Sequence, residues 1–524
     1  MSIWIAVPFA IAIGATVAFS GQADMSEAAA LKQMAQAVFG NLSAAESKLL
    51  DYAPRRDLAW IGPSSDPSNP SNLAAKASQW GSDRTIRAPL LAWLVSNPEA
   101  LRDVHPSGIG IAGARIVGPL DLSFMHVGAP ITIVNSAVSE GINLSYADTR
   151  ALDFRRDAIG PVEAAQAMVH GDFTLGQGSY ASVDLFRAKV DGDLNFSAGR
   201  FHGDGQPAVS AISATIGGDA LFHQEFESDG MVDFRLSTIG GSLSFNHVDF
   251  IGDGATGLDA ERARIGGTLY WTQIAVTPRT ILDLEDAEAG AFWDSPESWP
   301  AAGHLMLNGF EYKNFGEAPD DAATRLRWLS LQKPGYRSQP FNQLAQVLNN
   351  SGREQEAVSV LIAKRDARLR FGGLSVADRI WQFLLKVTIG YGYRPLQALW
   401  WMVGFVIFGS ILFGWGYRAG LVTPTEHHAY QSFLGGECPA HYPPFNAFVY
   451  SLENFLPLVD LHQAAHWRPN PRHIRDHQIR FFSLKRDIGK IEGGALRIYL
   501  WAHILSGWIL TPLFVAGISG LIHA

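Results

Sequence analysis

The 524-residue sequence contains a single cysteine, Cys438. One cysteine excludes an intrachain disulfide framework and any cysteine-rich zinc or iron–sulfur site. Charged residues are also scarce, at 17% against about a quarter in typical proteins. The formal net charge is −9, so the chain has no basic surplus for nucleic acid, and we predict that it binds none. A chain of this length should form two or three folding units.

Charge is missing altogether from residues 395–417, which form the first of two long apolar runs in the last quarter of the chain. As a helix, residues 396–413 alone would span roughly 27 Å, close to the thickness of the hydrocarbon layer of a membrane. A second apolar run follows Arg497. We predict that both runs are transmembrane helices and that the lipid bilayer is a partner of this chain.

A third apolar stretch, residues 3–19, lies at the amino terminus. It can be a signal peptide cleaved near residue 23 or a retained membrane anchor, and residues 1–23 are assigned to one or the other. No lysine or arginine precedes it, so the flanking charge that usually settles the choice is absent. The side of the membrane on which the following residues lie therefore stays open.

The middle of the chain is a repeat. Four similar phrases begin at Ala188, Ala214, Ser237 and Ala263, at intervals of 26, 23 and 26 residues. In each phrase a small residue, a β-branched residue and a glycine precede apolar residues that alternate with polar ones, which is typical of short strands in a stacked solenoid. We predict a right-handed parallel β-helix over residues 106–316, with glycine at its corners.

The flanking segments have helical patterns. Residues 24–105 are predicted to form an amino-terminal cap, with a helix in residues 80–94 that covers the first coil. Residues 317–373 are predicted to form a helical hairpin that serves as the opposite cap and linker. Residues 374–524 then form an interfacial amphipathic helix and a two-span membrane domain. The predicted fold is therefore mixed, with a capped β-helix followed by an all-α membrane domain.

Between the two predicted spans, residues 445–461 are apolar but too short to cross a bilayer, and Pro457 interrupts them. This segment is either a re-entrant helix or a helix that lies flat on the membrane surface. In the re-entrant arrangement Glu453, Asn454 and Asp460 are candidates for lining a pore, because carboxylates are costly to expose to lipid.

Histidines are concentrated near the carboxy terminus. His462 and His466, and likewise His473 and His477, are four residues apart, a spacing that can chelate a metal ion on a helix. Solvated loop histidines or a pH-responsive patch are the alternative that we favour.

We find no nucleophile elbow and no phosphate-binding loop, so we predict no catalytic residues and favour a non-enzymatic function. Glycines 108, 110 and 113, and again 252, 254 and 257, match the dinucleotide fingerprint. No helix is expected after either match, so we assign both to the repeat and predict no cofactor-binding residues.

Three phrases resemble the two-span pore-loop module of bacterial pentapeptide-repeat ion channel proteins. These phrases are Gly-Tyr-Gly-Tyr-Arg-Pro at 390–395, Ala-Phe-Val-Tyr-Ser at 447–451 and Phe-Val-Ala at 514–516. The resemblance implies a channel-like module that works as a symmetric homo-oligomer. The family's Thr-x-Gly-Tyr-Gly filter does not follow Ser451, so potassium selectivity is not implied. A similar phrase at 388–392 has no span before it, and we interpret it as a turn into the membrane.

The whole chain also resembles bacterial proteins labelled membrane-associated oxidoreductase, through residues 80–94, 105–116, the Ile-Gly-Gly repeats and residues 391–395. These resemblances imply a multi-pass protein of the bacterial inner membrane. Our first hypothesis is a β-helix sensor or scaffold coupled to a channel-like membrane domain. The alternative is a non-conducting scaffold that binds a protein or glycan on its β-helix, and the third is an oxidoreductase.

Overall fold

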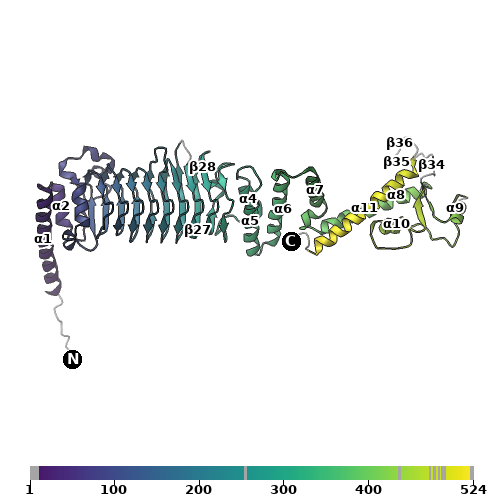
Figure 1. The fold of residues 1–524 in the computed structure, drawn as a ribbon, viewed down its shortest axis with the longest axis horizontal. Helices are drawn as coiled ribbons and strands as arrows, with labels where there is room; N and C mark the ends of the chain where they lie inside the picture. The colour runs from purple at the N-terminus through teal and green to yellow at the C-terminus, as the bar shows by residue number, and fades with distance from the viewer. Residues whose placement is uncertain are drawn as a thin grey trace, which may run out of the picture. The chain divides into compact units, whose positions relative to one another are not determined.

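The computed structural model divides the chain into two compact units, residues 1–360 and residues 361–524 (Figure 1). The structure describes residues 11–252, 256–434, 438–470, 474–475, 480–481, 484–485 and 491–519. The first unit is built around a β-solenoid, and the second is mainly helical.

The first unit begins with helices that precede the solenoid. They are α1 (Ile11–Phe39), α2 (Ala44–Tyr52) and α3 (Ala88–Ser96), with the short 3₁₀ helices η1 (Pro70–Asn72), η2 (Ala74–Gln79), η3 (Ser82–Arg84) and η4 (Ala100–Arg102). Helix α1 continues through residue 23 without a break. Helix α3 lies within the predicted capping segment but begins only at Ala88, since Pro89 is tolerated only in the first turn of a helix.

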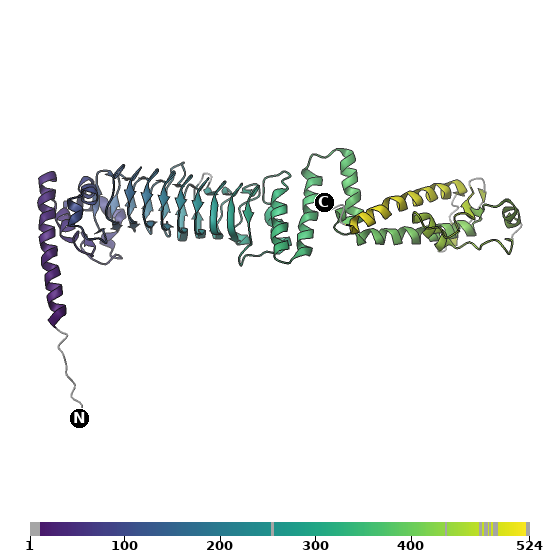
Figure 2. The same cartoon turned by 60° about the horizontal axis from the view of Figure 1, so that its bottom comes forward.

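Residues 109–312 form a parallel β-solenoid of about 9 turns, which confirms the predicted fold (Figure 2). The smaller of its two sheets has nine strands: β5 (Leu120–Asp121), β8 (Ile142–Asn143), β12 (Val162–Glu163), β16 (Val183–Asp184), β20 (Val209–Ser210), β23 (Met231–Asp233), β26 (Thr256–Asp259), β28 (Thr280–Asp283) and β30 (Leu305–Met306).

The larger sheet has 22 strands: β1 (Ala59–Trp60), β2 (Thr85–Arg87), β3 (Ile109–Ala112), β4 (Arg115–Val117), β6 (Ile131–Val134), β7 (Ala137–Val138), β9 (Asp148–Thr149), β10 (Leu152–Arg155), β11 (Ala158–Ile159), β13 (Met168–Val169), β14 (Phe173–Gly176), β15 (Ser179–Tyr180), β17 (Lys189–Val190), β18 (Leu194–Asn195), β19 (Arg200–Phe201), β21 (Thr215–Ile216), β22 (Ala220–Ser228), β24 (Thr238–Ile239), β25 (Leu243–Phe250), β27 (Arg264–Ala275), β29 (Glu288–Asp294) and β31 (Glu311–Tyr312). Strands β1 and β2 pair with β3 and β4, so this sheet begins within the segment assigned to the amino-terminal cap.

The solenoid corners are of two kinds. At the predicted glycine corner, a Cβ on Gly240 would overlap the carbonyl oxygen of Gly217 on the preceding coil, so close backbone packing requires glycine there. The other two corners use non-glycine residues in the left-handed conformation, such as Tyr146 (φ 60°) and Arg156 (φ 59°). These corners were not predicted from the sequence, because their residue types vary from coil to coil.

The solenoid interior is filled by side chains stacked in register. Phe222, Phe245 and Trp271 occupy equivalent inward positions on β22, β25 and β27, and all three are fully buried. The Phe222 and Phe245 rings are stacked with centroids 4.6 Å apart. Trp271 Nε1 donates a hydrogen bond of 2.6 Å to the Ser298 carbonyl, which satisfies the one polar atom that this ring buries.

Helices α4 (Ala322–Leu329) and α5 (Gln339–Asn350) follow the last coil, and α6 (Glu354–Phe371) begins after a short turn. A buried ion pair joins α4 to the solenoid, because Arg325 donates to both oxygens of Asp294 at 2.9 and 2.7 Å. The η5 helix (Pro296–Ser298) follows Asp294 in the chain. This bidentate pair between two fully buried side chains fixes the position of α4 at the end of the solenoid.

The second unit contains α7 (Val376–Ile389), η6 (Gly390–Gly392), α8 (Leu396–Arg418), α9 (His427–Leu434), α10 (Ala447–Phe455) and α11 (Gly493–Ile518). Three small antiparallel pairs accompany them: β32 (Val422–Pro424) with β33 (Trp467–Pro469), β34 (Ile474–Arg475) with β37 (Ile491–Glu492), and β35 (Arg480–Phe481) with β36 (Leu484–Lys485). Among the described residues, Leu396–Arg418 and Gly494–Ile518 are long and apolar enough to cross a membrane.

Candidate functional site

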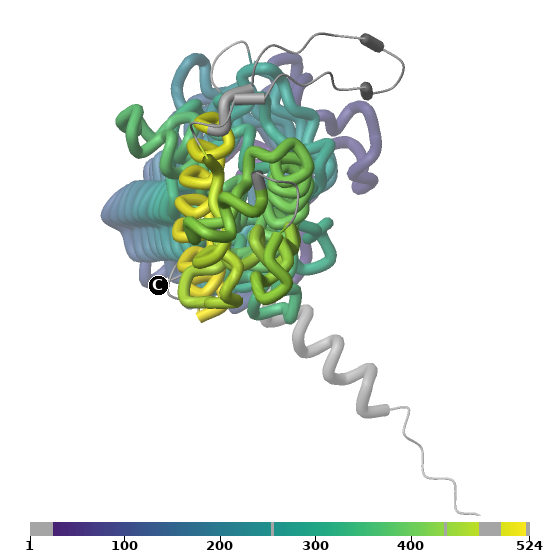
Figure 3. Tube along the Cα trace, turned by 90° about the vertical axis from the view of Figure 1, so that its right-hand side faces the viewer, coloured from purple at the N-terminus to yellow at the C-terminus, as the bar shows by residue number. Residues whose placement is uncertain are grey.

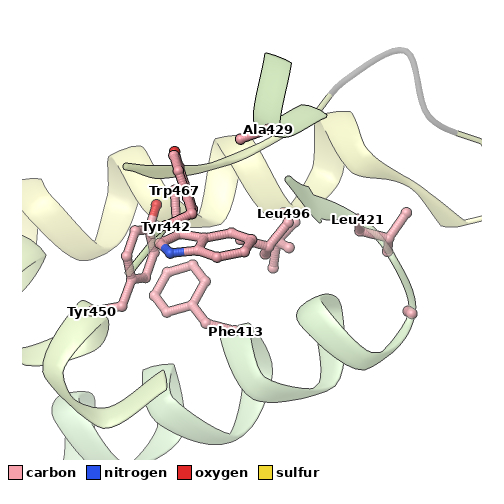
Figure 4. Close-up of a cluster of buried hydrophobic side chains, with 9 residues drawn as sticks. Phe413, Leu421, Ala429, Tyr442, Tyr450, Trp467 and Leu496 are labelled. Atoms are coloured by element: carbon pink, nitrogen blue, oxygen red, sulfur yellow. The ribbon is translucent and has the colours of Figure 1, made fainter. Parts of the chain in front are cut away.

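The helical unit is organised around α10, a nine-residue helix that packs against both α8 and α11. Figure 3 shows α11 in yellow beside the green segments that contain α8 and α10. Near one end of this group, Phe413 of α8, Tyr450 of α10 and Leu496 of α11 gather around Trp467 (Figure 4). The Phe413 and Tyr450 rings meet edge to face with centroids 5.0 Å apart. The short helix is therefore held by packing with both long helices.

A buried histidine links the three helices. His503 of α11 is 1% exposed, and its Nε2 lies 3.0 Å from the carbonyl oxygen of Ser451 in α10. Ser451 Oγ donates in turn to the Val406 carbonyl of α8 at 2.9 Å. The Nδ1 atom of His503 lies 3.4 Å from the Tyr499 hydroxyl. These contacts assign the tautomer that carries its proton on Nε2 and accepts from Tyr499 on Nδ1.

Small residues allow this contact. A Cβ on Gly409 of α8 would overlap Ser451 Oγ and the His503 ring, and one on Gly507 of α11 would overlap the Phe455 carbonyl. His503 was not predicted from the sequence, although a lone imidazole in an otherwise apolar run was a signal for it. An ionisable side chain buried within such a helix is a candidate functional residue.

Each of the three predicted pore-lining residues makes hydrogen bonds within the chain. Glu453 Oε2 accepts hydrogen bonds from the backbone N–H groups of Gln463 and Ala464, at 2.8 and 3.0 Å. The Asn454 side chain donates to the Tyr450 carbonyl of its own helix at 2.8 Å. Asp460 is exposed and accepts from the His462 backbone N–H at 2.9 Å. Within one chain, Glu453 thus holds the segment after α10 in place, and a pore-lining role for these residues stays a prediction.

The histidine pair is shaped by backbone contacts. His466 Nδ1 lies 2.6 Å from the His462 carbonyl oxygen, so one nitrogen of this ring is already occupied. His473 and His477 lie outside the described residues. Over the part of the chain that the structure describes, no three His, Cys, Asp or Glu side chains are grouped closely enough to hold a metal ion.

Two of the glycine motifs lie at solenoid strands, and the third lies between α7 and α8. Gly110 lies within β3 and Gly257 within β26, so both fingerprint matches enter solenoid strands. Residues 253–255 of the second match lie outside the described residues. The 388–392 phrase joins α7 to α8, where Gly390 and Tyr391 adopt left-handed conformations, as the predicted turn requires.

The first unit has a groove of about 620 Å³ near its carboxy-terminal cap. Its floor contains the glycine corners at 240, 266 and 290, which leave no room for side chains. Arg264, Glu288 and Glu311 stand in register on successive coils along one side. Gln343, Gln346 and Asn350 of α5 also line the groove. We call this feature the solenoid groove; its mixed charges and amides offer both hydrogen-bond donors and acceptors.

The chain matches no known family model, no curated protein and no solved structure, so its function has to be inferred from the geometry described above.

Proposed function

We propose that this protein is a multi-pass membrane protein of the cell membrane that presents a β-solenoid as a binding scaffold. The exposed apolar surface of α8 and α11 supports the membrane assignment most directly. Trp400 and Ile411 of α8 are 78% and 66% exposed, and Ile498 and Leu505 of α11 are 65% and 62% exposed. Lipid is the solvent in which such a surface is stable.

Membrane extraction tests this proposal. We expect the full-length protein to stay in the membrane pellet after alkaline carbonate and to be released only by detergent. The double variant Ile411→Arg, Leu505→Arg should lose most of this retention, because a charge in mid-span costs about 2.5–3.5 kcal/mol on insertion scales. Leu236→Arg, at a 54% exposed solenoid position, is the matched control and should behave like the wild type. Release of the wild type by carbonate alone would contradict the proposal.

The solenoid supplies the binding surface. Helices α2 and α3 pack against its first strands and α5 packs against β31 of its last coil, so both ends of its larger sheet are covered. The solenoid groove offers charged side chains and side-chain amides among its lining residues. A protein or glycan with many hydrogen-bonding groups and little net charge fits this groove best, because its charged residues are of both signs.

A channel-like homo-oligomer is the second candidate function, and α10 favours it. A short helix fixed between two spans by Ser451 and His503 is the arrangement expected of a pore helix, and one copy cannot enclose a pathway. We expect cation flux through reconstituted liposomes, a particle of several chains, and reduced flux in Asp460→Asn. Asp286→Asn on the solenoid is the control. A monomeric particle or the absence of flux would leave the scaffold function alone.

A further inference from the structure

The junction between α6 and α8 carries a charge opposite to that of the whole chain. Residues 361–395 contain seven lysines and arginines against two acidic residues, whereas the whole chain has a net charge of −9. Four of the basic residues lie on the last turns of α6: Lys364, Arg365, Arg368 and Arg370. Burial lowers the pKa of Lys364, and the positive charges of Arg365 and Arg368 lower it further.

The two acidic residues of this segment are already engaged. Asp366 accepts from Lys386 Nζ at 2.9 Å and from the Tyr391 hydroxyl at 2.8 Å. Asp378 takes part in the amino-terminal cap of α7 through Ser375. Among the described side chains, no carboxylate forms an ion pair with Arg365, Arg368 or Arg370. These three arginines are therefore available to an anionic partner.

Helix α7 adds an apolar face beside this basic cluster. Val376, Ile380 and Phe383 follow helical spacing on one side of α7 and are 74%, 61% and 59% exposed, and Trp381 next to them is 50% exposed. Exposed apolar side chains on a short amphipathic helix are typical of a helix lying in the membrane interface. The helix is too short to span the hydrocarbon layer itself.

Side-chain hydrogen bonds fix α6, α7 and α8 together. Asp366 of α6 accepts hydrogen bonds from Lys386 of α7 and from Tyr391 of η6. Gln397 and Trp401 of α8 both donate to the Val387 carbonyl of α7, at 2.9 and 3.0 Å. The basic residues, the exposed apolar residues of α7 and the start of the span thus belong to one hydrogen-bonded junction, which we call the basic elbow (residues 364–401).

We propose that the basic elbow binds the headgroups of anionic phospholipids at the membrane interface. Helix α7 is hydrogen-bonded to the first turns of the predicted span α8, so insertion of α8 brings lipid, rather than a soluble acidic partner, next to this junction. Guanidinium groups suit phosphate because they offer several N–H donors in one plane. This inference rests on the proposed membrane anchoring, and it adds a lipid preference and the residues responsible for that preference.

The test uses the full-length protein in phosphatidylcholine nanodiscs that contain a small fraction of dibrominated lipid. Bromine quenches tryptophan fluorescence on contact, and the difference between wild type and Trp381→Phe isolates the signal of Trp381. We expect brominated phosphatidylglycerol to quench Trp381 at a lower mole fraction than brominated phosphatidylcholine. The triple variant Arg365→Gln, Arg368→Gln, Arg370→Gln should lose this preference by about fivefold per arginine, which corresponds to about 1 kcal/mol each.

Two controls separate a lipid site from general charge or folding effects. The triple variant Arg150→Gln, Arg187→Gln, Arg279→Gln removes the same charge from exposed solenoid positions and should keep the preference. The conservative variant Arg365→Lys, Arg368→Lys, Arg370→Lys should retain most of the preference for phosphatidylglycerol. Equal quenching by both brominated lipids in the wild type would overturn the inference. Failure of the protein to enter nanodiscs at all would instead overturn the membrane anchoring itself.

Discussion

At the scale of single residues, the smaller solenoid sheet stacks like charges. Asp233, Asp259 and Asp283 stand in register on β23, β26 and β28. Arg235 donates from Nε to Asp233 Oδ1 and from Nη2 to Asp233 Oδ2, a bidentate pair, and its Nε lies 3.5 Å from Asp259 Oδ2. Asp283 lies one coil further from this cation. Its burial, together with the carboxylates of Asp259, Glu285 and Glu261, raises its pKa from 3.8 to about 6.

This raised pKa predicts a pH dependence of stability. The folded protein keeps the Asp283 proton up to about pH 6, whereas the unfolded chain loses it near 3.8. The folded state therefore binds more protons in this window, and the free energy of unfolding should fall as pH rises through it. Asp283→Asn cannot ionise and should show a shallower dependence and a higher urea midpoint at about pH 7.

Urea unfolding followed by circular dichroism between about pH 4 and about pH 7 measures this effect. Asp286→Asn is the matched control, because Asp286 is exposed and only three residues away. Burial also raises the pKa of Asp259, so part of the pH dependence of the urea midpoint should remain in Asp283→Asn. If the urea midpoint of Asp283→Asn changes with pH as steeply as that of the wild type, the assignment to Asp283 is contradicted.

At the scale of elements, the two kinds of solenoid corner predict opposite responses to substitution. Gly240→Ala places a Cβ against the backbone of the preceding coil and should destabilise the solenoid by about 1–3 kcal/mol. Ser213 adopts φ 57°, which is unfavourable for a residue with a Cβ. Ser213→Gly should therefore be neutral or stabilising, by up to about 1 kcal/mol after the loss of chain entropy.

Thermal unfolding of both variants in the same detergent distinguishes these expectations. The backbone hydrogen bond from Ser213 N–H to the Arg235 carbonyl, at 2.8 Å, survives in the glycine variant, so the comparison isolates conformational strain. Stabilisation by Gly240→Ala, or a clear loss of stability in Ser213→Gly, would contradict the account of the corners.

The same elements show what the sequence could predict. Strand alternation, the repeat interval and the long apolar runs are local signals, so the solenoid and the two long apolar helices could be predicted. The non-glycine corners have no shared residue type, as Phe124 and Arg187 illustrate, and were missed. The contact of His503 with Ser451 joins residues 52 positions apart, and no local pattern reports such a distance. Likewise, no local pattern indicates that the Glu453 carboxylate accepts hydrogen bonds from two backbone N–H groups ten and eleven residues later in the chain.

At the scale of the whole molecule, the proposed anchoring fixes which parts share a side of the membrane. Among the described residues, one candidate span, Leu396–Arg418, lies between the solenoid and the segment that joins α8 to α11. If α8 crosses the membrane as proposed, this single crossing should place the solenoid and that joining segment on opposite sides, whichever way the chain is inserted. Cys438 lies in the joining segment, is exposed and is the only cysteine of the chain, so it is a natural reporter.

We expect a membrane-impermeant maleimide applied to intact spheroplasts to label either the wild type or the variant Cys438→Ser, Arg279→Cys, but not both. Arg279 is exposed in a solenoid turn, so the new thiol is as accessible as the native one once the membrane is opened. Labelling of both proteins after permeabilisation is the control for reactivity. If intact cells label both proteins, or neither, α8 does not separate the solenoid from the joining segment, and the two-span arrangement is wrong. If they label one, the identity of that protein also gives the side of the solenoid, which the charge pattern of residues 1–23 left open.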